Sequence, residues 1–78
     1  GRVIRGAEVT IAEAIVERQT GADIVVCDGE HRDNFVLAVQ IEVAVGAYQR
    51  HSPHASAGKY ALPHVQQTTP PPLGHTFY

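Results

Sequence analysis

Histidines gather in the last third of this 78-residue chain, and imidazoles are the side chains best suited to moving protons near neutral pH. The segment from Tyr48 to Tyr78 contains no Asp or Glu. It holds four of the five histidines, His51, His54, His64 and His75, together with the only lysine of the sequence, Lys59. An acid-free segment with these residues favours a surface that meets an anion such as phosphate.

Metal-independent cleavage of RNA is the chemistry that these side chains fit best. Attack of a 2′-hydroxyl on the neighbouring phosphodiester needs a base, an acid and a cation near the phosphate, all near neutral pH. We expect the acid and the base among His54, His64 and His75. The other predicted site residues are polar groups that could bind substrate oxygens or a base: Gln66 with the catalytic histidines, and Lys59, Tyr60 and Arg50 as substrate-binding residues.

A metal site is the second interpretation of the same histidines. His51, His54 and His64 offer three imidazoles, which zinc accepts as ligands. Asp28 or Glu30 could add a carboxylate. Magnesium prefers oxygen ligands, and the tail has no acidic ones, so zinc is the ion favoured in this alternative. The preferred interpretation needs no cofactor, and for any one histidine a purely structural role is the competing explanation.

Two weaker patterns lie in the first half of the chain. Cys27 and His31 are near enough in sequence to suggest a nucleophile and a base, but a buried, unreactive thiol is the commoner situation. Asp23 followed by Glu30 is similar to the acidic pairs of metal-dependent nucleases, but Arg32 stands where those sites have a lysine. We expect neither pattern to form the site.

The first helix has clear signals at both ends. Residues 1–8 are expected to form a short extended lead-in. Thr10 and Glu13 make a capping box, in which each side chain bonds to the other residue's backbone N–H. Apolar residues then recur at spacings of three and four, and Gly21 suits a left-handed cap. The sequence therefore predicts a helix over 10–20.

A buried strand and a second helix follow. The β-branched run at 22–27, closed by an Asp-Gly turn, predicts a strand at the centre of a sheet. A helix is expected over 33–45, opened by Asp33 or Arg32 and ended by Gly46. Its apolar residues surround the cylinder, so we expect burial on more than one side or a covering partner. The many β-branched residues leave a strand as the alternative for this segment.

The tail is expected to add short, irregular antiparallel strands. Residues 48–51 are predicted to pair with the strand at 22–27. A strand over 60–66 contains a proline and would suit an edge. Pro70–Pro72 predict an extended polyproline segment, and 73–78 a closing strand or a docked tail.

Together these elements predict one α+β domain over 1–78, a small α/β layer structure in which two helices flank a short strand. Residues 1–47 form the helix–strand–helix scaffold and 48–78 the functional segment.

Residues 1–50 carry −3 and residues 51–78 carry +1, and the domain lacks the high pI of a protein held to nucleic acid by charge alone. One cysteine excludes an internal disulfide and a four-cysteine zinc site. No apolar run is long enough to cross a bilayer, so we expect no membrane partner.

The last residues also resemble a known family. The string HASAGKYALPHVQ, from His54 to Gln66, followed by PPLGHTFY at the end, is similar to the C-terminal segments of bacterial polymorphic toxins of the Rhs and contact-dependent inhibition types. The resemblance implies a secreted effector, often a nuclease, that is released from a large carrier, acts in the target-cell cytoplasm and is neutralised by an immunity protein. His54, His64, Gln66 and His75 carry over; Lys59 does not clearly belong to the pattern. The initial Gly and the lack of Met agree with origin from a longer polypeptide.

A non-catalytic interaction module is the rival hypothesis. In that case the apolar helix over 33–45 docks on a partner and the proline-rich tail serves as an extended adaptor. Cleavage assays on RNA and DNA, with and without a chelator, separate the two hypotheses.

Overall fold

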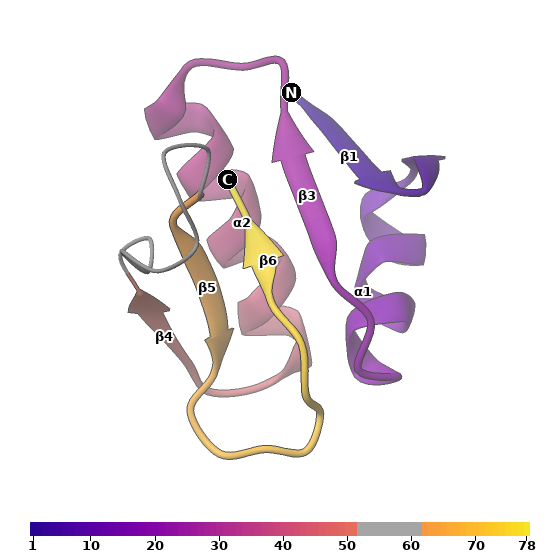
Figure 1. Cartoon of the computed structure of the whole chain (residues 1–78), viewed down its shortest axis with the longest axis vertical. Coiled ribbons are helices and arrows are strands. Elements are labelled where there is room, and N and C mark those ends of the chain that lie inside the picture. Colours follow the sequence, from indigo (N-terminus) through magenta and orange to yellow (C-terminus); the bar gives the residue numbers. More distant parts are fainter. Residues whose placement is uncertain (52–61) are drawn as a thin grey trace.

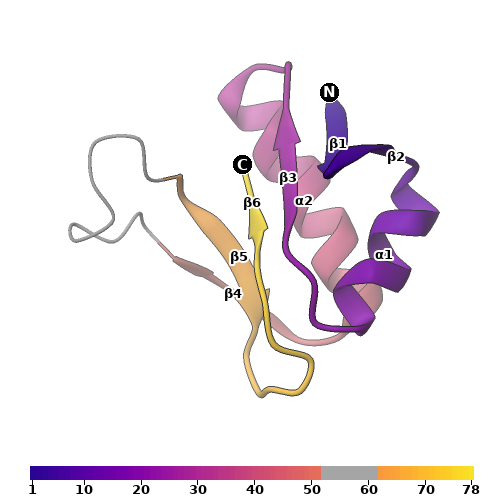
Figure 2. The same cartoon turned by 45° about the vertical axis from the view of Figure 1, so that its right-hand side comes forward.

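The computed structural model describes residues 1–51 and 62–78, and within them the chain forms a six-stranded mixed sheet with two helices (Figure 1). The turned view shows that both helices lie on the same side of the sheet (Figure 2). The predicted α+β class is therefore confirmed. The elements in chain order are β1 (Arg2–Arg5), β2 (Ala7–Val9), α1 (Ile11–Gln19), β3 (Ile24–Cys27), α2 (His31–Val45), β4 (Tyr48–His51), β5 (His64–Gln67) and β6 (Thr76–Phe77).

The first residues form a hairpin at one edge of the sheet, where the sequence predicted only an extended lead-in. β1 pairs antiparallel with β2 on one side and with β3 on the other. Gly6 joins the two strands with φ at +73°, a left-handed conformation that glycine adopts without a Cβ clash. Val3 is 4 % exposed. The lead-in therefore contributes to the core.

Helix α1 has both of the ends that the sequence predicted. Thr10 Oγ1 accepts from the Glu13 N–H at 3.1 Å, and Glu13 Oε1 accepts from the Thr10 N–H at 2.9 Å. At the other end the Gly21 N–H donates to the Arg18 carbonyl at 3.0 Å, and the next N–H donates to the Glu17 carbonyl at 3.1 Å. These two bonds, with Gly21 at φ +91°, make a Schellman motif. The chain leaves this turn directly toward β3.

Strand β3 is central, as predicted for 22–27, because the strand order is β2-β1-β3-β6-β5-β4. Ile24 and Val26 are buried against the helices, whereas Val25 and Cys27 are half-buried on the other side, as strand alternation requires. The side of the sheet away from the helices is termed the second face below. The buried apolar residues between sheet and helices are Val3, Ala14, Ile24, Val26, Ala38, Ile41, Val65 and Tyr78.

Helix α2 starts earlier than predicted. It runs over His31–Val45, with Glu30 as its N-cap, so Asp33 and Arg32 lie inside its first turns rather than opening it. The turn between β3 and α2 consists of residues 28–30, so the helix begins at His31. Gly46 ends the helix, as predicted.

Within the described part of the chain, the fully buried residues of α2 form one stripe. Ala38, Ile41 and Glu42 are its buried residues, at the three- and four-residue spacings of a single helical stripe. Val36 and Val43 are each 57 % exposed. Phe35, Leu37 and Val39 are partly buried beside this stripe, so the contact with the core is broader than the fully buried residues alone.

The tail forms half of the sheet, so it is part of the fold as well as a surface. β4 pairs with β5, not with β3 as predicted, because the parallel strand β6 occupies the position beside β3. β5 lies inside the sheet between β4 and β6, although an edge strand was expected over 60–66. Pro63 comes just before this strand, so its missing N–H does not interrupt the ladder.

The proline run does not form the predicted extended segment. Residues 68–75 bend between β5 and β6, and the peptide bonds Pro70–Pro71 and Pro71–Pro72 are cis. The chain then closes with β6, which confirms the closing strand expected within 73–78.

A charged network is buried beneath the sheet. Arg18 and Glu42 are both 0 % exposed, and Arg18 Nε donates to Glu42 Oε1 at 2.5 Å. Gln67 Nε2 donates to Glu42 Oε2, and Thr76 Oγ1 donates to Glu42 Oε1 at 2.8 Å. Two charges are tolerated at this depth because each has hydrogen-bonding partners. The network joins α1, α2, β5 and β6.

Candidate functional site

Parallel pairing of β3 and β6 brings Asp23 and His75 together. Ile24 lies opposite Thr76 in the register, so Asp23 and His75 immediately precede adjacent parallel strands. The His75 N–H donates to Asp23 Oδ1 at 2.8 Å, and the same oxygen lies 3.4 Å from His75 Nδ1. The side chains of Asp23 and His75 are 57 % and 37 % exposed, so both reach solvent.

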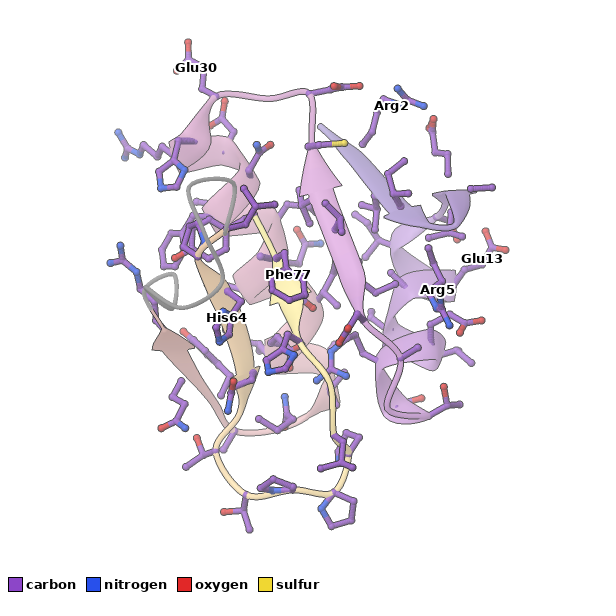
Figure 3. The ribbon with its side chains drawn as sticks, in the orientation of Figure 1. Arg2, Arg5, Glu13, Glu30, His64 and Phe77 are labelled. Carbon is purple, nitrogen blue, oxygen red and sulfur yellow. The ribbon has the colours of Figure 1, made fainter. Side chains whose placement is uncertain are left out.

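A second imidazole contacts this pair. His64 begins β5, and its ring centroid lies 4.7 Å from that of His75, with the ring planes at 78°. The Phe77 ring lies 5.5 Å from His64 and 5.4 Å from His75. Figure 3 shows His64 and Phe77 beside each other on neighbouring strands. Because His64 is 2 % exposed, His75 is the imidazole of this pair that solvent reaches.

Three of the residues predicted to be catalytic lie on the second face. His64 and Gln66 alternate along β5 with Val65, which is buried against the helices. His75 joins them through its ring contact with His64. The structure therefore brings His64, Gln66 and His75 to one face of the sheet.

Arg50, predicted to bind substrate, has its side chain on the opposite face. Its Nε donates to Tyr78 Oη at 3.0 Å, and its guanidinium carbon lies 5.2 Å from the centroid of the Phe35 ring. Phe35 belongs to α2, so these contacts lie on the side covered by the helices. Arg50 packs the C-terminal tyrosine against α2 and lies away from His75.

Three predicted site residues, His54, Lys59 and Tyr60, lie outside the described residues. The backbone of His51 is described and pairs with that of His64 across β4 and β5. Within residues 1–51 and 62–78, no group of three or more His, Cys, Asp or Glu side chains is arranged to hold a metal ion. The alternative zinc site includes His54 and so extends beyond these residues.

Cys27 and His31 lie on different sides of the sheet. Cys27 is half-buried on the second face. The His31 ring lies 5.3 Å from the Tyr78 ring, which is 3 % exposed among the residues packed against the helices. A nucleophile–base pair made of these two residues is therefore not formed.

Asp23 and Phe77 lie beside His64 and His75, and sequence reasoning missed both of them as site residues. The signal for Asp23 was its position: it is a carboxylate immediately before a buried strand, and His75 is an imidazole immediately before the last strand. The sequence does not show that these two strands are parallel neighbours. From the sequence alone, Asp23 therefore suggests only a metal ligand.

Two groups in the N-terminal part of the chain have shifted pKa values. Hydrogen bonding to Thr10, first through its backbone N–H and then through its side chain, lowers the pKa of the Glu13 carboxyl. Side-chain hydrogen bonds to Asp28 and then to Glu8 raise the pKa of the Arg2 guanidinium. Figure 3 shows Arg2 and Glu13 away from His64, so these interactions support the scaffold.

Neither helix in the described part of the chain is long and apolar enough to span a membrane. No protein-family model, curated protein or solved structure was found to match the chain. The function is therefore argued from the residues of the second face and from the sequence of the tail.

Proposed function

We propose that this chain is the toxin module of a bacterial polymorphic toxin and that it cleaves RNA by metal-independent acid–base catalysis. The observation that supports this most is the contact between His64 and His75, with the Asp23 carboxylate beside His75. Neighbouring imidazoles can supply a proton donor and a proton acceptor near pH ~6.5, where an unperturbed imidazole titrates.

The reaction requires two proton transfers. A base removes the proton of a ribose 2′-hydroxyl, and the 2′-oxygen attacks the adjacent phosphorus. The bond from phosphorus to the 5′-oxygen breaks, and an acid gives that oxygen a proton. The products are a 2′,3′-cyclic phosphate and a 5′-hydroxyl. His75 performs one transfer because its ring reaches solvent, and His64 and His54 are the candidates for the other.

Asp23 orients His75 in this mechanism. A carboxylate beside Nδ1 favours the tautomer with its proton on that nitrogen, which leaves Nε2 to exchange a proton with the substrate. The 3.4 Å separation is longer than the usual N–H···O distance of about 2.7–3.2 Å, and such contacts tighten when substrate binds. The 2.8 Å bond from the His75 N–H holds the carboxylate in place before that.

The remaining roles come from the sequence. Lys59 is the proposed phosphate contact, and Gln66 and Tyr60 would hydrogen-bond a base or an oxygen of the RNA. The toxin resemblance adds three partners: a large carrier protein, a dedicated immunity protein and the RNA of a target cell. In this proposal the module is secreted with its carrier, acts in the target-cell cytoplasm and needs no cofactor.

Incubation of the purified chain with total RNA and with plasmid DNA, each with and without EDTA, tests the proposal. We expect RNA to be degraded equally with and without EDTA and DNA to stay intact. Cleavage that EDTA abolishes would instead favour the zinc alternative. Failure to cleave either substrate would contradict the nuclease proposal.

Histidine variants locate the activity. His75→Ala should abolish cleavage with unchanged far-UV circular dichroism, because the side chain is partly exposed. His64→Ala should also abolish cleavage. His31→Ala is the matched control: it removes an exposed imidazole that contacts Tyr78 and should leave cleavage unchanged. Equal cleavage by all three variants would show that the second face is not the site.

A non-catalytic interaction module is the second candidate, and exposed valines on α2 favour it. Val36 and Val43 are seven residues apart, so they lie on the same side of the helix, each 57 % exposed. An apolar stripe of this kind suits the groove of a partner. A chain that cleaves neither RNA nor DNA, and whose binding to a partner is lost in Val36→Asp, would favour this function.

A further inference from the structure

The buried Arg18 guanidinium lies directly behind the Asp23–His75 pair. Its Nε is bound to Glu42, which leaves the two terminal nitrogens to point toward the loops. Nη1 donates to the Ala22 carbonyl at 3.0 Å and to the Leu73 carbonyl at 2.7 Å. Nη2 donates to the Gly74 carbonyl at 3.2 Å. One side chain therefore binds the backbone of two segments that are far apart in sequence.

Two of these carbonyls, those of Ala22 and Gly74, belong to the residues that immediately precede the site residues. Ala22 comes before Asp23, and Gly74 comes before His75. A peptide unit is planar, so a bond that fixes the Gly74 carbonyl also fixes the direction of the His75 N–H. That N–H is the group that donates to Asp23 Oδ1 at 2.8 Å. Arg18 thus holds the peptide units from which both site residues extend.

Glu42 fixes the other end of the arrangement. It accepts from Arg18 Nε and also from Thr76 Oγ1, and Thr76 is the residue immediately after His75. His75 is therefore held on both sides, at Gly74 through Arg18 and at Thr76 through Glu42. Arg18, Glu42 and Thr76 are all 0 % exposed, so the bonds of Glu42 to Arg18 and Thr76 are shielded from water, whereas the bond from Arg18 to the Gly74 carbonyl is part-buried.

We propose that Arg18, oriented by Glu42, is a positioning residue that sets His75 against Asp23 and His64. This inference rests on the proposed function, since it assigns a role to Arg18 in the same acid–base site. Arginine suits the role because its planar guanidinium has five N–H donors in a fixed fork. The ammonium of lysine carries the same charge but cannot reach a carboxylate and three carbonyls with that geometry.

Gly74 allows the backbone to come this close. Its φ is +91°, and a Cβ at this position would lie 2.6 Å from the Gly21 carbonyl oxygen and 2.8 Å from Arg18 Nη1. Alanine here would push the loop away from the guanidinium while the Arg18–Glu42 pair stays intact. Gly74→Ala therefore disturbs the positioning from the loop side, and Arg18→Lys disturbs it from the helix side.

The test combines NMR of the histidines with kinetics on RNA. In the wild-type chain we expect cross-relaxation between the His64 and His75 ring protons and slow hydrogen exchange of the His75 amide. Arg18→Lys and Gly74→Ala should both lose the ring contact and the amide protection, and kcat should fall about 100-fold with little change in KM. Ile41→Ala is the control. Ile41 precedes Glu42 in the sequence and is buried in the core, so its truncation opens a cavity without removing a donor from the loop carbonyls.

The outcomes separate the two proposals. If Ile41→Ala loses the ring contact as fully as the other variants, general destabilisation explains the effect and the positioning role is overturned. Retention of wild-type ring contacts and amide protection in Gly74→Ala overturns it as well, and this holds even if Arg18→Lys does not fold. If the NMR changes occur as expected but the wild-type chain cleaves no RNA, the arrangement stands and the proposed function fails.

Discussion

Replacement of Glu42 by glutamine should be the most damaging conservative change in this chain. The substitution keeps an oxygen for Thr76 but leaves the Arg18 guanidinium without a negative partner at 0 % exposure. Removing one partner of a buried ion pair typically costs about 3–5 kcal/mol. A domain of 78 residues has a total stability of roughly 4–12 kcal/mol. Glu42→Gln should therefore remove a large share of the free energy of unfolding.

Urea unfolding followed by far-UV circular dichroism measures this loss. With an m-value of about 1 kcal/mol per M, the midpoint should fall by about 3 M or more. Glu17→Gln is the matched control: it makes the same change on α1, at a carboxylate that is 44 % exposed and 3.8 Å from Arg5. That variant should stay within about 0.5 kcal/mol of the wild type, since exposed pairs contribute little.

A double variant tests whether the cost comes from the unpaired charge. Arg18→Met with Glu42→Leu removes both charges, so it should be less destabilising than the sum of the two single changes by about 2–3 kcal/mol. Full compensation is not expected, because the carbonyls of Ala22, Leu73 and Gly74 lose their donor. Additive costs, or a loss below about 1 kcal/mol in Glu42→Gln, would refute the reasoning.

Three further predictions concern smaller contributions. The Thr10 backbone hydrogen bond lowers the folded-state pKa of Glu13. The wild type should therefore be more stable than Glu13→Gln above pH ~4.3, and this difference should vanish as the pH falls through the lowered pKa. Urea titrations across the acid range measure the difference. Gly21→Ala should lower the free energy of unfolding by about 1–2 kcal/mol in the same assay, because the φ of Gly21 is +91°, a left-handed conformation. A Cβ at this position would make only ordinary van der Waals contacts, so the cost comes from the backbone. A neutral effect would contradict the helix-cap argument. Asp23→Asn keeps an acceptor for the His75 N–H but removes the charge. The kcat on RNA should therefore fall, while the free energy of unfolding stays within about 0.5 kcal/mol of the wild type. An unchanged kcat would argue against an orienting role for Asp23.

Local signals in the sequence predicted the scaffold well, because each depends on neighbouring residues. The Thr10–Glu13 capping box, the Gly21 cap and the β-branched run before Cys27 are short-range patterns with one physical outcome. Strand pairing depends on partners far along the chain. Nothing near residues 48–51 showed that they would pair with β5 rather than β3, or that the last strand would run parallel to β3.

The candidate site divides in the same way. His64, Gln66 and His75 could be selected from residue type and composition, and alternation along β5 places two of them on one face. Arg50 could not be placed, because its face depends on the register of β4 with β5. Arg18 and Glu42 look from sequence like ordinary helix charges, and their burial follows only from the packing of both helices beneath the tail strands.

The chemistry of the cleaved ends tests the central claim most directly. A short RNA should be incubated with the chain in EDTA and its products analysed by mass spectrometry, beside the same RNA made with 2′-deoxyribose at every position. The acid–base mechanism predicts 2′,3′-cyclic phosphate and 5′-hydroxyl ends from the RNA, no cleavage of the deoxy substrate, and no product with His75→Ala. Cleavage of the deoxy substrate, products with 5′-phosphate ends, or intact RNA would contradict it.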